Sequence, residues 1–94
     1  MLENLNSLNL NTLLDNNILI YPNPYIDGFF VKNFHENTLK IDIFNIMGHL
    51  VFSTYVDKEE AVVYISQTSS FSSGVYFLQT NNSTNFQTLM KLHE

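Results

Sequence analysis

Turn-forming residues interrupt this chain at intervals of about 8–12 residues, and this spacing constrains its fold more than any other feature. The runs between the turns are short, and several alternate apolar with polar side chains. In residues 39–43, for example, Lys40 and Asp42 separate three apolar residues. Because a period of two is typical of a half-buried strand, and no segment sustains an apolar period of 3.6, we expect strands rather than helices.

Seven strands are expected from these runs. They are Ile18–Tyr21, Phe29–Phe34, Leu39–Ile43, Leu50–Val56, Ala61–Ile65, Val75–Thr80 and Phe86–Leu92. In the fourth strand, Leu50, Phe52 and Val56 are expected to share a face. Seven short strands with turns between them predict an all-β fold, namely an antiparallel β-sandwich that is immunoglobulin-like or close to it. A barrel is the alternative.

The alternation also predicts which apolar residues face outward. If the apolar residues of 39–43 and those at Tyr76 and Leu78 point into the core, then Phe44, Val75 and Phe77 point away from it. Sheet edges and loops could cover these three, or they are scattered surface residues of a kind that every domain has. The functional alternative is an apolar strip that binds a partner.

Composition excludes several classes of partner. The 94 residues are enough for one domain with a modest core, and 45% of them are hydrophobic. Charged residues make up 14%, the net charge is −5, and arginine is absent. The four lysines (Lys32, Lys40, Lys58 and Lys91) are far apart in the sequence. Binding to nucleic acid or to an anionic membrane needs clustered basic residues, so neither is expected.

The residues contain no pattern that predicts catalysis, a cofactor or a metal site. Cysteine is absent, and His35, His49 and His93 have no partner at the spacing of metal ligands. The acidic pair at 59–60 reads as a solvated turn, and the serines of 69–73 do not form a nucleophile elbow. We therefore expect a function in surface recognition, without enzymatic activity.

Residues 1–17 differ from the rest of the chain. Leucine alternates there with asparagine and serine, which allows an added edge strand, but the high asparagine content favours a partly ordered linker. The segment lacks the basic start and the continuous apolar run of a signal peptide. We expect residues 18–94 to form the domain, and any leader to lie at the far end of a longer precursor.

Four motifs follow one another in a characteristic order. They are Ile-Tyr-Pro-Asn-Pro at 20–24, Ile-Asp-Ile-Phe-Asn-Ile-Met-Gly at 41–48 with Val51 after it, Ile-Ser at 65–66 before Gly-Val-Tyr-Phe-Leu at 74–78, and Leu-Met-Lys-Leu at 89–92. Together they resemble the type A C-terminal sorting domain of the type IX secretion system, which is found at the ends of proteins exported by Bacteroidetes. The resemblance covers residues 18–94.

This resemblance implies a transport signal. The cargo would cross the inner membrane with a separate signal peptide, and translocon components would recognise the sorting domain in the periplasm. The domain would carry its N-terminal cargo across the outer membrane to the cell surface or the medium. A surface sorting peptidase would usually remove the domain by cutting within or before residues 1–17, and the cargo would be released or attached to lipopolysaccharide.

Eight residues of the matching motifs are candidates for recognition by the translocon. They are Pro22, Asn23, Pro24, Gly48, Gly74, Tyr76, Leu89 and Lys91. The family often carries further lysines before the last apolar pair, whereas Gln87 and Thr88 stand there in this chain. The last strand could lie at a sheet edge and pair with a strand of a receptor, and a homodimer through an edge strand is a further option.

An adhesion or carbohydrate-binding sandwich is the alternative function. Such a module needs exposed aromatic side chains that form a flat platform near the loops. The chain has no tryptophan, and Tyr25, Phe29 and Tyr64 are the candidates for such a platform.

Overall fold

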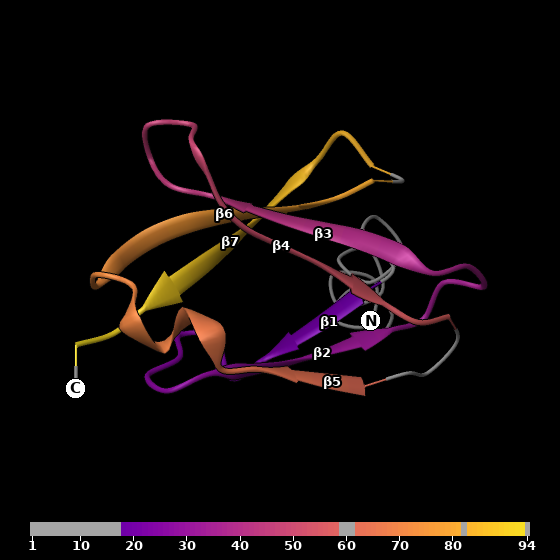
Figure 1. The fold of residues 1–94 in the computed structure, drawn as a ribbon, viewed down its shortest axis with the longest axis horizontal. Helices are drawn as coiled ribbons and strands as arrows, with labels where there is room; N and C mark the ends of the chain where they lie inside the picture. The colour runs from indigo at the N-terminus through magenta and orange to yellow at the C-terminus, as the bar shows by residue number, and fades with distance from the viewer. Residues whose placement is uncertain (1–17, 59–61, 82, 94) are drawn as a thin grey trace, which may run out of the picture.

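The computed structural model describes residues 18–58, 62–81 and 83–93, which form two antiparallel β-sheets packed face to face (Figure 1). The strands are β1 (Ile18–Tyr21), β2 (Phe29–Asn33), β3 (Leu39–Phe44), β4 (Leu50–Val56), β5 (Val62–Ile65), β6 (Gly74–Thr80) and β7 (Phe86–Lys91). A single 3₁₀ turn, η1 (Gln67–Ser70), precedes β6. The predicted seven-stranded sandwich is confirmed, while the predicted linker at 1–17 lies outside the described residues.

The smaller sheet has the order β1-β2-β5 and the larger sheet the order β4-β3-β6-β7. Three pairs of consecutive strands, β1–β2, β3–β4 and β6–β7, are neighbours within a sheet. After β4 the chain crosses to the smaller sheet as β5, and after η1 it returns to the larger sheet as β6. β4 and β7 are therefore the two edges of the four-stranded sheet.

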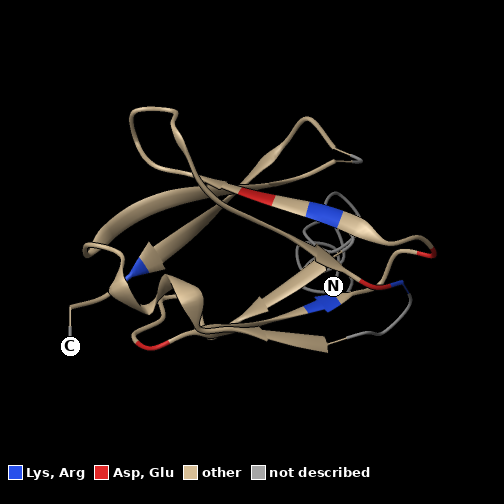
Figure 2. Ribbon diagram, viewed as in Figure 1, with Lys and Arg blue, Asp and Glu red and all other residues tan. Residues whose placement is uncertain are grey.

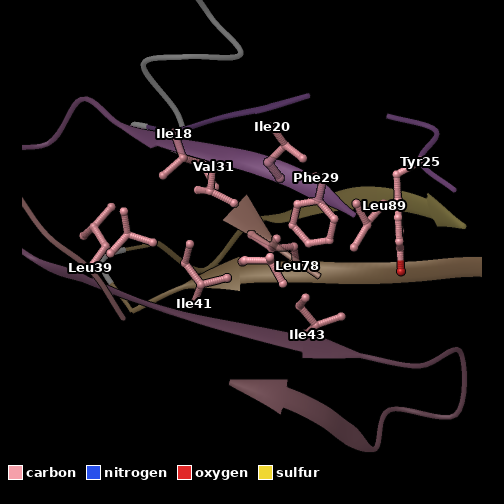
Figure 3. Close-up of a cluster of buried hydrophobic side chains, with 12 residues drawn as sticks. Ile18, Ile20, Tyr25, Phe29, Val31, Leu39, Ile41, Ile43, Leu78 and Leu89 are labelled. Carbon is pink, nitrogen blue, oxygen red and sulfur yellow. The ribbon is translucent and has the colours of Figure 1, made fainter. Parts of the chain in front are cut away.

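The core lies between the sheets and contains every second side chain of the central strands (Figure 3). Ile18 and Val31 of the smaller sheet face Ile41, Ile43 and neighbouring residues of the larger sheet, and all four are fully buried. Full burial of one such side chain stabilises the fold by about 1.5–3 kcal/mol. The period-two pattern of the sequence thus becomes the hydrophobic interior.

One predicted orientation is wrong. Leu50 does not share a face with Phe52 and Val56, because a β-bulge shifts the register between Ile43 and Phe44. The bulge places Leu50 opposite Phe44, and 54% of Leu50 is exposed. A bulge adds one residue to one strand of a pair, so it reverses the alternation beyond that point.

Asn33, at the end of β2, is a fully buried polar residue. Its Nδ2 group lies within hydrogen-bond distance of Asn37 O (3.0 Å), Val56 O (3.2 Å) and Asp57 O (2.7 Å). Its Oδ1 accepts a hydrogen bond from His35 N (2.7 Å). One side chain therefore joins the end of the smaller sheet to the end of β4, and a buried amide of this kind is costly to leave unpaired.

Charged side chains are confined to a few positions (Figure 2). Neither residues 43–56 nor residues 62–90 contain Asp, Glu, Lys or Arg. The β3–β4 turn, most of β4 and most of the β6–β7 hairpin are consequently uncharged. Within the described part of the chain, no helix is long and apolar enough to cross a membrane.

Candidate recognition surface

The chain turns sharply where β1 ends. Pro22 and Pro24 have no N–H groups for a ladder, and their rings fix the backbone φ angle, so the strand stops at Tyr21. The peptide bonds Tyr21–Pro22 and Asn23–Pro24 are both cis. After this turn the chain passes along the outer edge of β7, and Pro22, Asn23 and Pro24 are exposed.

The side chain of Asn23 binds that edge as a peptide group would. Its Nδ2 donates a hydrogen bond to Thr88 O (2.8 Å), and its Oδ1 accepts one from Met90 N (2.9 Å). A side-chain amide carries the same donor and acceptor as a backbone peptide. Asn23 therefore takes the place of one peptide unit in a neighbouring strand.

The backbone of Tyr25 continues this contact. Its N–H donates to Met90 O (2.9 Å), and its carbonyl oxygen accepts from Leu92 N (2.8 Å). Two hydrogen bonds from Asn23 and two from Tyr25 thus cover the edge of β7 up to Leu92. We call residues 22–25 together with residues 88–92 the terminal corner.

Tyr25 also anchors the corner in the core. It is 1% exposed, and its ring packs edge-on against Phe29 with the centroids 4.9 Å apart. Its hydroxyl donates a hydrogen bond to Thr68 O in η1 (3.1 Å). Burial raises the pKa of the Tyr25 hydroxyl above its usual value of 10.0. The turn is therefore held from inside by its tyrosine and from outside by Asn23.

Lys91 brings the one charged side chain of the corner, and it is only 6% exposed. Its Nζ donates a hydrogen bond to Leu92 O (2.8 Å) and lies 5.8 Å from the centroid of the Tyr25 ring, within cation–π range. Tyr25 and Lys91 also form a parallel β-bridge. The ammonium group is therefore packed against the domain and not displayed on its surface.

Leu89 of the corner and two further candidate residues, Tyr76 and Gly74, are joined through the β6–β7 ladder. Leu89 is fully buried and lies opposite Tyr76, whose hydroxyl donates a hydrogen bond to Ser72 O (2.8 Å). Gly74 lies opposite Lys91 and has a φ of +145°, a conformation that favours glycine. The structure thus brings these motif residues of the last two strands together.

Gly48 lies outside the terminal corner, in the turn between β3 and β4. Its N–H donates to Asn45 O (2.9 Å), and Asn45 Oδ1 accepts hydrogen bonds from Met47 N and His49 N (2.9 and 3.0 Å). The φ of Gly48 is +85°, a conformation that favours glycine. Asn45 lines a hollow of about 220 Å³ together with residues 72–76, so the turn approaches β6 beside Gly74.

A larger apolar hollow borders the corner on its other side. It has a volume of about 330 Å³, and Pro22, Pro24, Leu92, Phe30 and Tyr64 are among its lining residues. The first three belong to the terminal corner, and the last two to the outer face of the smaller sheet. The proline turn after β1 and the residue that follows β7 therefore line the same apolar hollow.

The three aromatic residues expected to form a carbohydrate-binding platform do not come together on the surface. Of the three candidates, Tyr25 and Phe29 are buried in the core, and Tyr64 is 47% exposed. Tyr64 instead joins a row with Phe30 and Tyr21, with centroid distances of 4.8 and 5.4 Å. The Tyr21 and Phe30 rings stack on each other, and both residues remain partly exposed, at 40% and 38%.

The outward-facing phenylalanines of the larger sheet cover one another. Phe86 packs edge-on against Phe44 (5.9 Å between centroids) and Phe77 (6.2 Å), and Val75, Phe44 and Phe77 are half-buried. These rings line a further apolar hollow of about 430 Å³. Sequence reasoning identified Phe44 and Phe77 but missed Phe86, which belongs to the last predicted strand.

The polar side chains of the described residues do not assemble a metal site. No group of three or more His, Cys, Asp or Glu residues lies close enough there to hold an ion. His35 Nδ1 accepts a hydrogen bond from Asn37 N (3.0 Å), which is a local turn contact.

The family model for the secretion system C-terminal sorting domain matches residues 19–93, and both halves of the terminal corner lie within that match. The chain belongs to this family. It is a sorting signal of type IX secretion, which directs proteins to the cell surface or the medium, and such a signal domain is not itself catalytic.

Two curated relatives of the sorting domain are lyases. An ulvan lyase of Nonlabens ulvanivorans is 32% identical over 66 residues, which are 70% of this chain and 12% of that enzyme. An endo-acting ulvan lyase of Formosa agariphila is 24% identical over 79 residues, or 84% of this chain and 15% of that enzyme. The chain thus spans a small fraction of either relative. No solved structure matches it.

The two departures of this sorting domain from the family pattern leave the corner intact. Thr88 binds Asn23 through its backbone carbonyl, so the hydrogen bond does not depend on the side chain at that position. Gln87 lies opposite Leu78 in the β6–β7 ladder. The two hydrogen bonds of the Asn23 side chain do not involve it. Backbone contacts of this kind tolerate sequence change, which suits a signal shared by many cargo proteins.

Proposed function

We propose that the secretion machinery recognises the sorting domain at its terminal corner. The observation that carries this proposal is the set of four hydrogen bonds by which Asn23 and Tyr25 cover the edge of β7. The first and the last motif of the family pattern are thereby one structural unit. A receptor at this surface would require the whole domain to be folded, because residues 22–25 and 88–92 meet only in the sandwich.

Each candidate residue has a role in this proposal. Pro22 and Pro24 form the exposed rim, Asn23 fixes that rim to β7, and Leu92 completes the apolar hollow beside it. The end of β7 is positioned by Leu89 and Lys91 of the corner and by Gly74 and Tyr76 of β6. Gly48 acts separately, by holding the β3–β4 turn next to β6. The receptor would contact the rim and the hollow, while the buried residues maintain their shape.

The wider pathway is part of the same proposal. The domain would follow its N-terminal cargo into the periplasm, meet the translocon components there and be cut off at the surface by the sorting peptidase. The cut would fall within or before residues 1–17, and the folded signal would begin at Ile18. β1 runs from Ile18 towards the terminal corner (Figure 1), so the cargo would be attached at the opposite end of the sandwich and leave the corner accessible.

Reporter export tests this function. Residues 1–94 would be fused behind a signal peptide and a fluorescent protein in a secretion-competent Bacteroidetes host and in a translocon-deficient strain. We expect surface or medium fluorescence only in the competent host. If the fusion stays in the periplasm of both strains while its sorting domain is folded, the chain is not a sufficient export signal and the proposal fails.

A further inference from the structure

The second edge of the four-stranded sheet, β4, is open. Within the described residues β4 pairs with β3 alone, and no segment lies along its other side as residues 23–25 lie along β7. A further hydrogen bond, from Asn33 Nδ2 to Val56 O, engages only the last residue of the strand. The backbone groups on the outer side of β4 are therefore available to a partner.

β4 also lacks most of the usual protection of an edge strand. Proteins commonly protect such edges with proline, with lysine or by keeping the strand short. β4 has seven residues, compared with four in each of the edge strands β1 and β5, and it contains neither proline nor a charged residue. Its bulge is the one such device present, and it affects the first residues of the strand.

Three of the seven side chains of this strand are both apolar and exposed. Leu50 is 54% exposed, Val51 37% and Tyr55 66%. No Asp, Glu, Lys or Arg occurs between residues 43 and 56, and Figure 2 shows the same uncharged course from the β3–β4 turn along β4. A partner lying beside β4 would therefore meet backbone hydrogen-bonding groups and apolar side chains, without a charged group within the strand.

We propose that β4 is a docking edge for an extended, uncharged polypeptide strand of the secretion machinery, which adds to the sheet as a fifth strand. Open backbone donors and acceptors at a sheet edge select a strand as their ligand, because only another extended backbone matches their repeat. The absence of charge selects an uncharged segment. This inference rests on the proposed function, since it names a second contact for the same signal.

The size of the edge argues against a second copy of this chain as the occupant. Seven residues extend over about 23 Å at a rise of roughly 3.3 Å per residue. A standard stable interface between two folded domains buries roughly 800 Å² per partner, which requires contacts well beyond a single seven-residue edge. An extended segment is not bound by this requirement, and its short-lived attachment suits a signal that must be released.

The experiment adds lysines to the edge within the export reporter. Val51→Lys/Ser53→Lys places two ammonium groups along β4, where strand addition would have to desolvate them. Ser53 lies opposite Asp42 and donates a hydrogen bond to its Oδ1, and the second lysine replaces that bond with an opposite-charge pair. Thr84→Lys/Asn85→Lys is the matched control, because it adds the same charge in the exposed loop between β6 and β7.

We expect the β4 variant to be exported at least tenfold more slowly than wild type, with an unchanged melting temperature, and the loop variant to be exported like wild type. Equal export of all three fusions would overturn the docking edge but leave the sorting function standing. Failure of the wild-type fusion itself would overturn the sorting function and this inference with it. A dimer of the isolated domain in sedimentation that the β4 lysines dissolve would identify a second copy as the occupant and contradict the proposal.

Discussion

The two edges of the four-stranded sheet differ in whether another segment of the described chain covers them. At β7, Asn23 and Tyr25 occupy the backbone groups from Thr88 to Leu92. At β4, no segment of the described chain covers the outer side, and the bulge is the main irregularity. Lys91 in β7 is the one charged residue in the two edge strands. The charge content of the strands therefore does little to distinguish the covered edge from the open one.

The difference between the two edges shows what the Pro-Asn-Pro turn at residues 22–24 does for the fold. The proline–asparagine–proline turn closes one edge of a sheet to which β1 itself does not belong. It therefore ties the beginning of the domain to its end and joins the two sheets at that end. Within the described residues, this closure leaves β4 as the open edge of the four-stranded sheet for strand addition.

Removing the closed edge is expected to have the largest effect. Deletion of residues 89–94 takes away Leu89, which is fully buried, together with the partners of Tyr25. Loss of a buried leucine alone costs about 2–5 kcal/mol, a large part of the stability of a domain of this size. We expect the reporter to accumulate in the periplasm with an unfolded signal, measured by export and by circular dichroism. Undiminished export would show that the last strand is dispensable.

The end of the open edge depends on Asn33. Asn33→Ala leaves the carbonyl groups near β4 and the His35 N–H without their partner in a buried site. We expect a loss of about 3 kcal/mol of unfolding free energy, measured by chemical denaturation. Asn33→Asp is the control, because it retains an acceptor for His35 but no donor, and it should also destabilise. An unchanged midpoint for both variants would show that water replaces the side chain.

The turn that leads into the open edge is expected to contribute less. Gly48 has a φ of +85°, and no atom lies within 4 Å of a Cβ built at this position, so the cost of substitution is conformational. Gly48→Val should reduce stability by about 1–2 kcal/mol, visible as a lower melting temperature. Gly48→Asn, which tolerates this conformation better, should lose less. Equal melting temperatures for wild type and the valine variant would contradict the turn geometry.

Opening the closed edge itself should have the smallest effect on stability. Asn23→Ala removes two exposed hydrogen bonds, to Thr88 O and from Met90 N, and should cost about 1 kcal/mol. Hydrogen exchange of the Met90 amide should accelerate, because that N–H loses its acceptor. Asn23→Asp keeps the acceptor and should protect Met90 more than alanine does. If the Met90 amide exchanges at the wild-type rate in both variants, the hydrogen bonds between the Asn23 side chain and β7 are not formed in solution.

Much of the fold could be predicted because its signals are local. Period-two alternation and turn residues located all seven strands to within a residue or so at most ends. Leu50 was placed on the wrong face because a bulge changes the phase of a strand without leaving a clear mark in its sequence. Asn33 carried a usable signal that was overlooked, since it is in phase with Phe29 and Val31 and therefore faces the core.

The recognition surface could be predicted only in part. The motif residues were identified from the family resemblance, but their contacts span 65 and 67 positions in the sequence and depend on how the two sheets pack. No local pattern shows that Tyr25 is buried, because its burial follows from the turn docking on β7. Lys91 did carry a signal, since it is in phase with the buried Leu89. The hollow beside the corner likewise exists only after residues 22–24 meet Leu92 and the smaller sheet.

The most direct test of the terminal corner is the export rate of the reporter fusion carrying Asn23→Ala. Ile20→Val is the control for stability, because it shortens a core side chain at a similar cost of about 0.5–1.5 kcal/mol while leaving the corner unchanged. If the corner is the recognition surface, Asn23→Ala slows export at least tenfold at a temperature where both variants are folded, and Ile20→Val does not. Equal export rates for the two variants would contradict it.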